Sequence, residues 1–146
     1  MKKIKLIIAL FIAAATSINL HAQCSSVVKE AIGKLTVYGS TGQTNSATIE
    51  KGNKVEMHLS FYKGVNYKLQ FGADKSLGQY NFRIVDESGK ELYKYDGNGA
   101  DYFTFFSNSS QELIVEMSAA DTSKKGCVAV AVGMQAPKKS NSIRNL

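Results

Sequence analysis

Residues 80–95 carry the clearest structural signal in the chain: Tyr-Asn-Phe-Arg-Ile-Val, then Asp-Glu-Ser-Gly, then Lys-Glu-Leu-Tyr-Lys-Tyr. Two runs of alternating apolar and polar residues flank a four-residue polar turn, which is the pattern of a β-hairpin. Asp86 at the first turn position and Gly89 at the fourth favour a type I turn. The segments on either side repeat the alternation across residues 55–117. The sequence therefore predicts an antiparallel β core.

Further strands are predicted at spacings near ten residues. The cleanest covers residues 55–61, where apolar residues alternate with Glu56, His58 and Ser60. The others are residues 36–39, 47–50, 67–71, 80–85, 90–95, 102–106, 112–118 and 127–132. Apolar residues at helical spacing predict one short helix over residues 25–35, and the Gly/Ser/Thr/Asn-rich residues 40–45 predict a loop. This pattern predicts an all-β fold, an antiparallel β-sandwich of about eight strands with a short N-terminal helix.

The N-terminus has the pattern of a signal peptide. Lys2, Lys3 and Lys5 precede a ten-residue apolar run, residues 6–15, which is too short to span a bilayer as a helix. A more polar segment follows and ends at Ala22. We expect cleavage after Ala22, with cleavage after Ser17 as the alternative. The chain is therefore predicted to be exported, to the periplasm or the cell exterior, with no transmembrane span in its mature part.

Removal of the signal peptide changes the charge of the chain. The three signal lysines belong to the 18 basic residues, so 15 basic residues remain against 12 acidic ones, a net charge of +3. This modest charge is spread along the chain and argues against a nucleic-acid surface. We expect one β-sandwich domain at residues 23–137, a polar tail at residues 138–146, and a monomer.

Two cysteines, Cys24 and Cys127, belong to the predicted mature chain. Export implies an oxidising compartment, in which an even pair of cysteines forms a disulfide. The alternative is two separate thiols, with Cys127 buried in a strand and Cys24 free or lipidated. Gln23 before Cys24 is larger than the small residue that lipidation requires.

Few residues in the mature part suit catalysis. His58 is its one histidine, on the polar side of an alternating strand, and no nucleophile elbow of the form Gly-x-Ser-x-Gly is present. We therefore expect a protein that is not an enzyme and needs no cofactor.

Two groups of residues are candidates for binding. Oxygen atoms of Asp86, Asp96, Asn98 and Asp101 would suit a calcium ion if they met at one end of a sandwich, although the segment from residue 96 lacks an EF-hand pattern. The alternative is a set of turns that use Asp, Asn and Gly for their backbone preferences. In the aromatic stretch, Tyr93, Tyr95 and Tyr102 would stack on a sugar or peptide if exposed, whereas the alternative is a core of cross-strand aromatic pairs.

Several segments together resemble a group of small exported proteins of Bacteroidota that has no assigned activity. The resemblance covers most of the mature chain and is carried by residues 61–67, 82–86, 91–93, 113–117 and 126–133. At the level of the fold it is similar to the bacterial pre-peptidase C-terminal domain, which implies a jelly-roll-like sandwich. Members of that family often bind calcium through paired aspartates in a strand, and the corresponding strand here is Phe-Arg-Ile-Val.

These observations predict a non-catalytic binding or envelope-supporting role, with an unknown envelope protein or glycan as the partner. The alternative is a carbohydrate- or peptide-binding accessory module that uses an aromatic sheet face.

Overall fold

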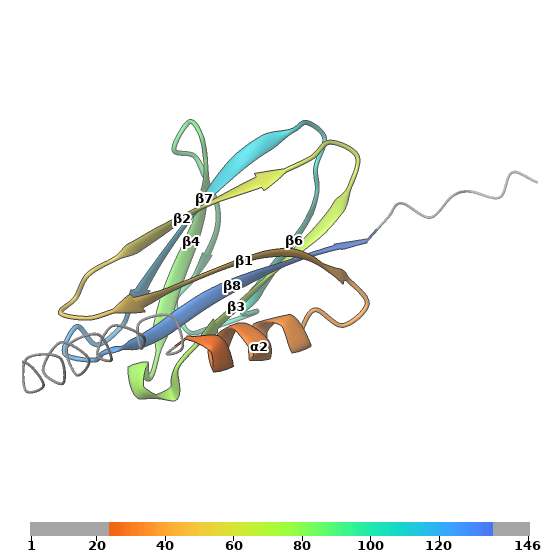
Figure 1. Cartoon of the computed structure of the whole chain (residues 1–146). Coiled ribbons are helices and arrows are strands. Elements are labelled where there is room, and N and C mark those ends of the chain that lie inside the picture. The colour runs from red at the N-terminus through yellow and green to blue at the C-terminus, as the bar shows by residue number, and fades with distance from the viewer. Residues whose placement is uncertain (1–23, 136–146) are drawn as a thin grey trace, which may run out of the picture.

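The computed structural model describes residues 24–135, and the predicted signal peptide and tail lie outside them. Alternating residue patterns place eight strands in this range, and one helix precedes them (Figure 1). The elements are α2 (Ser25–Gly33), β1 (Gly39–Ile49), β2 (Val55–Phe61), β3 (Asn66–Ala73), the 3₁₀ helix η1 (Lys75–Leu77), β4 (Tyr80–Asp86), β5 (Glu91–Tyr95), β6 (Tyr102–Phe106), β7 (Gln111–Ala119) and β8 (Gly126–Gln135). Within residues 24–135, no helix is long and apolar enough to cross a membrane.

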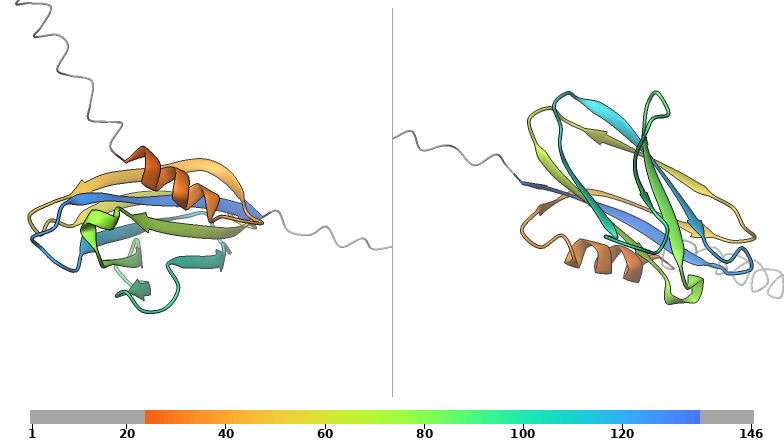
Figure 2. Two further views of the ribbon diagram at one scale, coloured as in Figure 1. Left: turned by 90° about the horizontal axis from the view of Figure 1, so that it is seen from below. Right: turned by 180° about the vertical axis from the view of Figure 1, so that it is seen from behind.

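The strands form two antiparallel sheets that pack face to face (Figure 2). One sheet has the order β1-β8-β3-β6 and the other the order β2-β7-β4-β5, which we call the 1-8-3-6 sheet and the 2-7-4-5 sheet. The chain changes sheet at every connection except the β4–β5 hairpin. This is the strand order of a jelly roll, so the predicted all-β sandwich is confirmed.

The predicted central hairpin is formed by β4 and β5. Phe82 lies opposite Tyr95 in the register of the two strands. The backbone N–H of Gly89 donates to the carbonyl oxygen of Asp86 at 2.9 Å, and Gly89 has a φ of +84°. A positive φ favours glycine, so the sequence at this position fixes the turn.

Alternation along the strands builds the core between the sheets. Leu59 of β2, Val115 of β7 and Val130 of β8 are fully buried there, as the period-two pattern predicts. His58 points outward from β2 and is exposed, again as predicted. In β3, Lys68 and Gln70 alternate with Tyr67, Leu69 and Phe71, but they do not face solvent, because they are only 8% and 1% exposed.

The helix α2 covers this outer face of the 1-8-3-6 sheet (Figure 2). Its Val27 and Ala31, and Leu35 just after it, pack against the outward side chains of β8, which are small: Cys127, Ala129 and Ala131. Gly133 continues this row, and a Cβ atom there would lie 2.8 Å from the Cβ of Tyr38. Small residues therefore let the helix approach the sheet closely.

A disulfide joins Cys24, at the start of α2, to Cys127 of β8, with an S–S distance of 2.03 Å. The predicted bridge is thus confirmed. A sulfur in a disulfide cannot also carry a lipid thioether, so the structure corresponds to the bridged alternative and excludes the lipidated one.

The largest difference from the sequence prediction lies at residues 36–50. The predicted strand at residues 36–39 is a turn, in which Tyr38 N donates to Leu35 O at 3.2 Å. The predicted loop at residues 40–45 belongs to β1, which runs for 11 residues with an irregularity between Ser40 and Thr44. Pairing with β8 supplies backbone hydrogen bonds that the local composition does not reveal.

Candidate functional site

The strands β5 and β6 form one edge of the sandwich, which we call the closed edge. Rings from both sheets meet there, because Tyr93 of β5 and Phe103 of β6 have their centroids 5.4 Å apart. The contacts continue inward through Phe82, whose centroid lies 5.0 Å from that of Tyr95 and 3.7 Å from that of Phe71. This edge is therefore filled by aromatic side chains that pack against the core.

The three predicted ligand-binding tyrosines do not share a face. Tyr93 and Tyr95 are half-buried in the closed edge, and the Tyr93 hydroxyl donates to Ala100 O at 2.8 Å. Tyr102 lies on the outer face of β6, where Lys68 Nζ sits 4.7 Å from its ring centroid. The arrangement therefore offers no single aromatic platform built from these three rings.

Two of the predicted cation ligands, Asp86 and Asp96, lie at opposite ends of β5. The Asp86 carboxylate accepts hydrogen bonds from the Ser88 hydroxyl and from the backbone N–H groups of Lys90 and Ser88, all within its own hairpin turn. The bond from the Ser88 hydroxyl, together with the two backbone bonds, lowers the pKa of Asp86. Asp96 and Asn98 lie together at the other end of β5, with Asn98 Nδ2 3.5 Å from Asp96 Oδ1. Within residues 24–135, no three His, Cys, Asp or Glu side chains are grouped to hold a metal.

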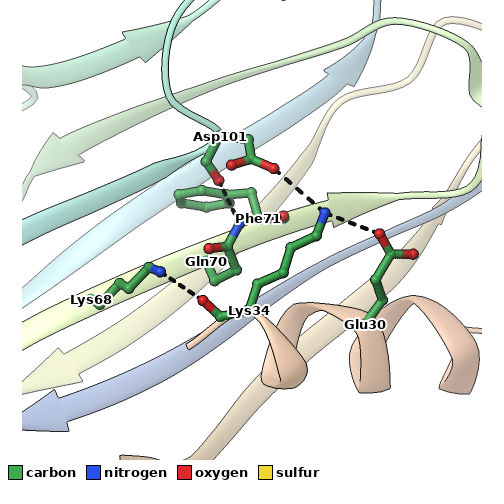
Figure 3. A network of polar contacts seen from close by, with 6 residues as sticks. All are labelled: Glu30, Lys34, Lys68, Gln70, Phe71 and Asp101. Carbon is green, nitrogen blue, oxygen red and sulfur yellow. Dashed lines mark hydrogen bonds and ion pairs between the residues drawn. The ribbon is translucent and has the colours of Figure 1, made fainter. Parts of the chain in front are cut away.

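Asp101 instead joins a polar network between α2 and the segment that connects β5 to β6 (Figure 3). Lys34 Nζ lies 3.0 Å from Glu30 Oε1 and 3.7 Å from Asp101 Oδ2, and the hydrogen bond with Glu30 raises the pKa of Lys34. Gln70 Nε2 donates to Asp101 O at 3.1 Å.

The buried Lys68 completes this network. Its Nζ donates to Lys34 O at the end of α2, at 2.7 Å, where a cation interacts favourably with the helix dipole. The burial of Lys68 and Gln70 is therefore satisfied by hydrogen bonds, and the network fastens the helix and the β5–β6 connection to the sheet.

The outer face of the 2-7-4-5 sheet carries a polar groove of about 390 Å³. Arg83 and Glu116 both line this groove, and the Arg83 guanidinium donates two hydrogen bonds of 2.7 Å to the Glu116 carboxylate. These bonds lower the pKa of Glu116. The groove is lined by Lys54, Asn81, Phe82, Arg83, Glu91, Lys94, Tyr95, Asp96, Glu116, Met117 and Ser118. It thus presents hydrogen-bond donors and acceptors in similar measure.

The strands β1 and β2 form the other edge of the sandwich, which we call the open edge. β1 pairs only with β8, and β2 pairs only with β7, so each has one unpaired side. Two hollows lie between them. A shallow one of about 580 Å³ is lined by Thr44, Asn45, Ser46, Ala47, Glu56, Met57 and His58. His58 Nδ1 is hydrogen-bonded to Glu112 Oε1 at 2.6 Å on the outer side of this edge.

The second hollow, which we call the end pocket, has a volume of about 350 Å³ and a mostly apolar lining. Its residues come from both sheets: Thr41, Gln43, Ser60, Tyr62, Tyr67, Val132 and Met134. The side-chain nitrogen of Gln43 is buried and has no hydrogen-bond partner among the residues that the structure describes. Sequence reasoning missed this pocket because it assigned residues 40–45 to a loop, and the only signal was an apolar Tyr62 just after a strand.

Comparison with known proteins yields structural neighbours alone. No protein-family model and no curated protein matches the chain. Among solved structures, the Yersinia pseudotuberculosis-derived mitogen matches with a TM-score of 0.50 at 10% identity, over 68% of this chain and 90% of its own. Aeromonas hydrophila PliG, a periplasmic inhibitor of g-type lysozyme, matches with a TM-score of 0.49 at 13% identity, over 68% of this chain and 89% of its own. A de novo designed double-stranded β-helix matches with a TM-score of 0.34 at 13% identity, over 64% of this chain and 99% of its own.

At 10% identity, the likeness to the mitogen is one of fold alone. It agrees with the β-sandwich described above and carries no activity to this chain. The resemblance to exported Bacteroidota proteins and to the pre-peptidase C-terminal domain is not confirmed by these matches and stays a prediction.

Proposed function

We propose that the chain is an exported, non-catalytic domain that binds a protein partner through its open edge. The observation that carries this proposal is the pair of unpaired strand edges, β1 and β2, which face each other across a hollow. Export is supported by the signal-peptide pattern and by the Cys24–Cys127 disulfide, since disulfides persist in oxidising compartments.

The composition of β1 favours pairing with another chain. Natural edge strands are commonly protected by lysine, proline or inward charges. β1 has the sequence Gly-Ser-Thr-Gly-Gln-Thr-Asn-Ser-Ala-Thr-Ile, with no charged residue and no proline, and only its one irregularity interrupts the edge. An extended segment of a partner adds to such an edge through main-chain hydrogen bonds.

The residues that suit catalysis are occupied. Both cysteines form the disulfide, and exposed His58 is hydrogen-bonded to Glu112. The two cysteines therefore supply no thiolate nucleophile for a base such as His58 to activate, which supports a binding role.

A second candidate function is glycan binding in the groove of the 2-7-4-5 sheet. The side chains of Asn81, Lys94 and Ser118 line this groove and make no hydrogen bond within residues 24–135. Sugar hydroxyls both donate and accept, so they suit a lining of mixed donors and acceptors. On a polysaccharide array, binding that Lys94→Met weakens and Ser46→Lys leaves intact would favour this candidate.

Site-specific photo-crosslinking in the native envelope tests the proposed function. A photoreactive residue replaces Ser46 on β1 or, as the matched control, Thr104 on β6. Both positions are exposed and lie on edge strands of the 1-8-3-6 sheet. We expect one partner to crosslink from position 46 and not from position 104, and Ser46→Lys to abolish its co-purification while Thr104→Lys does not. Crosslinks from position 104 alone, or only to a second copy of this chain, would contradict the proposal.

A further inference from the structure

We infer that the end pocket accepts an uncharged, extended peptide segment, which inserts one apolar side chain and offers a backbone carbonyl to Gln43. This inference rests on the proposed function, because the segment would belong to the partner that binds the open edge. It adds the chemistry by which the partner is recognised.

The pocket has the construction of a binding site. Tyr67 and Val132 form a buried wall, whereas Tyr62 and Met134 at its mouth are 73% and 48% exposed. Ligand pockets are concave and mostly apolar, with few polar groups that fix orientation. A volume of about 350 Å³ lies at the lower end of the range for such pockets, which suits one or two side chains better than a large ligand.

Local hydrogen bonds hold the walls in position. The Thr41 hydroxyl donates to Val132 O at 3.0 Å and accepts from Gln43 N at 3.1 Å, which fixes the irregular part of β1. On the opposite wall, Tyr62 N donates to the Tyr67 hydroxyl at 3.0 Å. The backbone of Gln43 is therefore anchored, while its buried side-chain nitrogen has no acceptor among residues 24–135. A buried donor without an acceptor is unfavourable, so the Gln43 side chain would gain a hydrogen bond by turning its nitrogen toward an incoming carbonyl.

Charge selects an uncharged occupant. None of the seven lining residues is charged, and neither is any residue of β1. A charged group would lose water here without gaining a partner. An extended segment fits best because β1 offers a free edge beside the pocket, and alternate side chains of an added strand would point into it.

Two-dimensional NMR titration of the mature chain tests the inference. The probe is the blocked pentapeptide acetyl-Ser-Leu-Ser-Leu-Ser-amide, and its counterpart with Asp in place of both Leu is the matched control. We expect the uncharged peptide to shift the side-chain amide signals of Gln43 and the backbone signals of Tyr62 and Met134, and the acidic peptide to shift none of them. Gln43→Met should weaken binding about three- to tenfold, the loss expected for one neutral hydrogen bond.

Two further variants make the test specific. Tyr62→Ala should weaken binding, whereas Phe106→Ala, which removes an exposed ring from β6, should leave it unchanged. Unchanged affinity in Gln43→Met, or shifts confined to another surface, would overturn the inference. Binding of isobutylbenzene without binding of the peptide would assign the pocket to a small apolar ligand and also overturn it. The proposed function fails separately, through loss of the crosslink from position 46.

Discussion

The two edges of this sandwich have opposite construction. At the closed edge, the rings of Tyr93 and Phe103 bridge the two sheets with centroids 5.4 Å apart. At the open edge, a hollow of about 580 Å³ separates β1 from β2. All four edge strands have one unpaired side, so the two edges differ in what lies between the sheets: packed rings at the closed edge and a hollow at the open edge.

We propose that the two edges have separate tasks. Aromatic side chains at the closed edge bury apolar area and stabilise the fold. At the open edge, the side chains of β1 are mostly small and polar, and β1 and β2 each have one side without a strand partner. The tyrosines that the sequence offered as ligand platforms, Tyr93 and Tyr95, thus pack against the core, whereas the binding surface that we propose is the open edge.

The largest expected effect is at the closed edge. Phe82→Ala should lower the free energy of unfolding by about 3–5 kcal/mol, because Phe82 is buried and stacks with both Phe71 and Tyr95. Tyr62→Ala at the open edge should change it by about 0.5 kcal/mol or less, since its ring is largely exposed. Urea unfolding of both variants measures the difference, and equal losses would remove the distinction between the edges.

The disulfide lies on the outer face of the 1-8-3-6 sheet, where both of its sulfur atoms are 4.0 Å from the hydroxyl of Thr48 on β1. We expect its loss to affect stability more than binding. Replacing Cys24 and Cys127 with serine opens a loop of 103 residues, which should cost about 2–5 kcal/mol. Hydrogen exchange should show α2 losing protection first, while crosslinking from position 46 persists below the melting temperature. Loss of partner binding in a folded double variant would mean that the helix contributes to the site.

Lysine substitutions on β1 and β6, the two edge strands of the 1-8-3-6 sheet, compare the two edges in partner binding while changing the free energy of unfolding little. Ser46→Lys should alter the free energy of unfolding by about 0.5 kcal/mol or less, because Ser46 is exposed. Thr104→Lys should lower it by up to about 1 kcal/mol, because Thr104 lies opposite Lys68. Only Ser46→Lys should impair partner binding. A strongly destabilised Ser46→Lys protein would indicate that β1 depends on its side chains more than the structure suggests.

The smallest effect concerns the Arg83–Glu116 pair on the 2-7-4-5 sheet. Hydrogen bonding by Arg83 lowers the pKa of Glu116 in the folded state, so its contribution to stability is present above the unfolded pKa and is lost as pH falls through the folded pKa. We expect the urea midpoints of the wild type and Arg83→Met to differ slightly at pH 7 and to converge below about pH 4. Lys94→Met, which removes an unpaired cation opposite Arg83, is the control. A difference that persists at low pH would mean that packing, not charge, is lost.

Much of the fold follows from period-two alternation. The central hairpin and the inward residues of β2 and β7 are predicted correctly, because side chains that alternate between core and solvent leave a clear pattern. The alternation fails at Lys68 and Gln70, where α2 covers the face that would otherwise be wet. That covering depends on tertiary packing and leaves no local signal on β3.

The candidate site was largely hidden from the sequence. Residues 40–45 have a loop-like composition, and only pairing with β8 makes them part of a strand. The aromatic stretch at residues 93–106 shows where large side chains gather, but not that it divides between two sheets. The unsatisfied side chain of Gln43 becomes visible only when both walls of the end pocket are in place.

Amide hydrogen exchange with and without the crosslinked partner tests the central claim most directly. We expect binding to slow exchange along β1 at Thr44, Asn45, Ser46 and Ala47, while the exchange of the β5 and β6 amides is unchanged. Slowed exchange at β5, at β6 or across the groove of the 2-7-4-5 sheet, with β1 unaffected, would contradict the claim that the open edge is the binding surface.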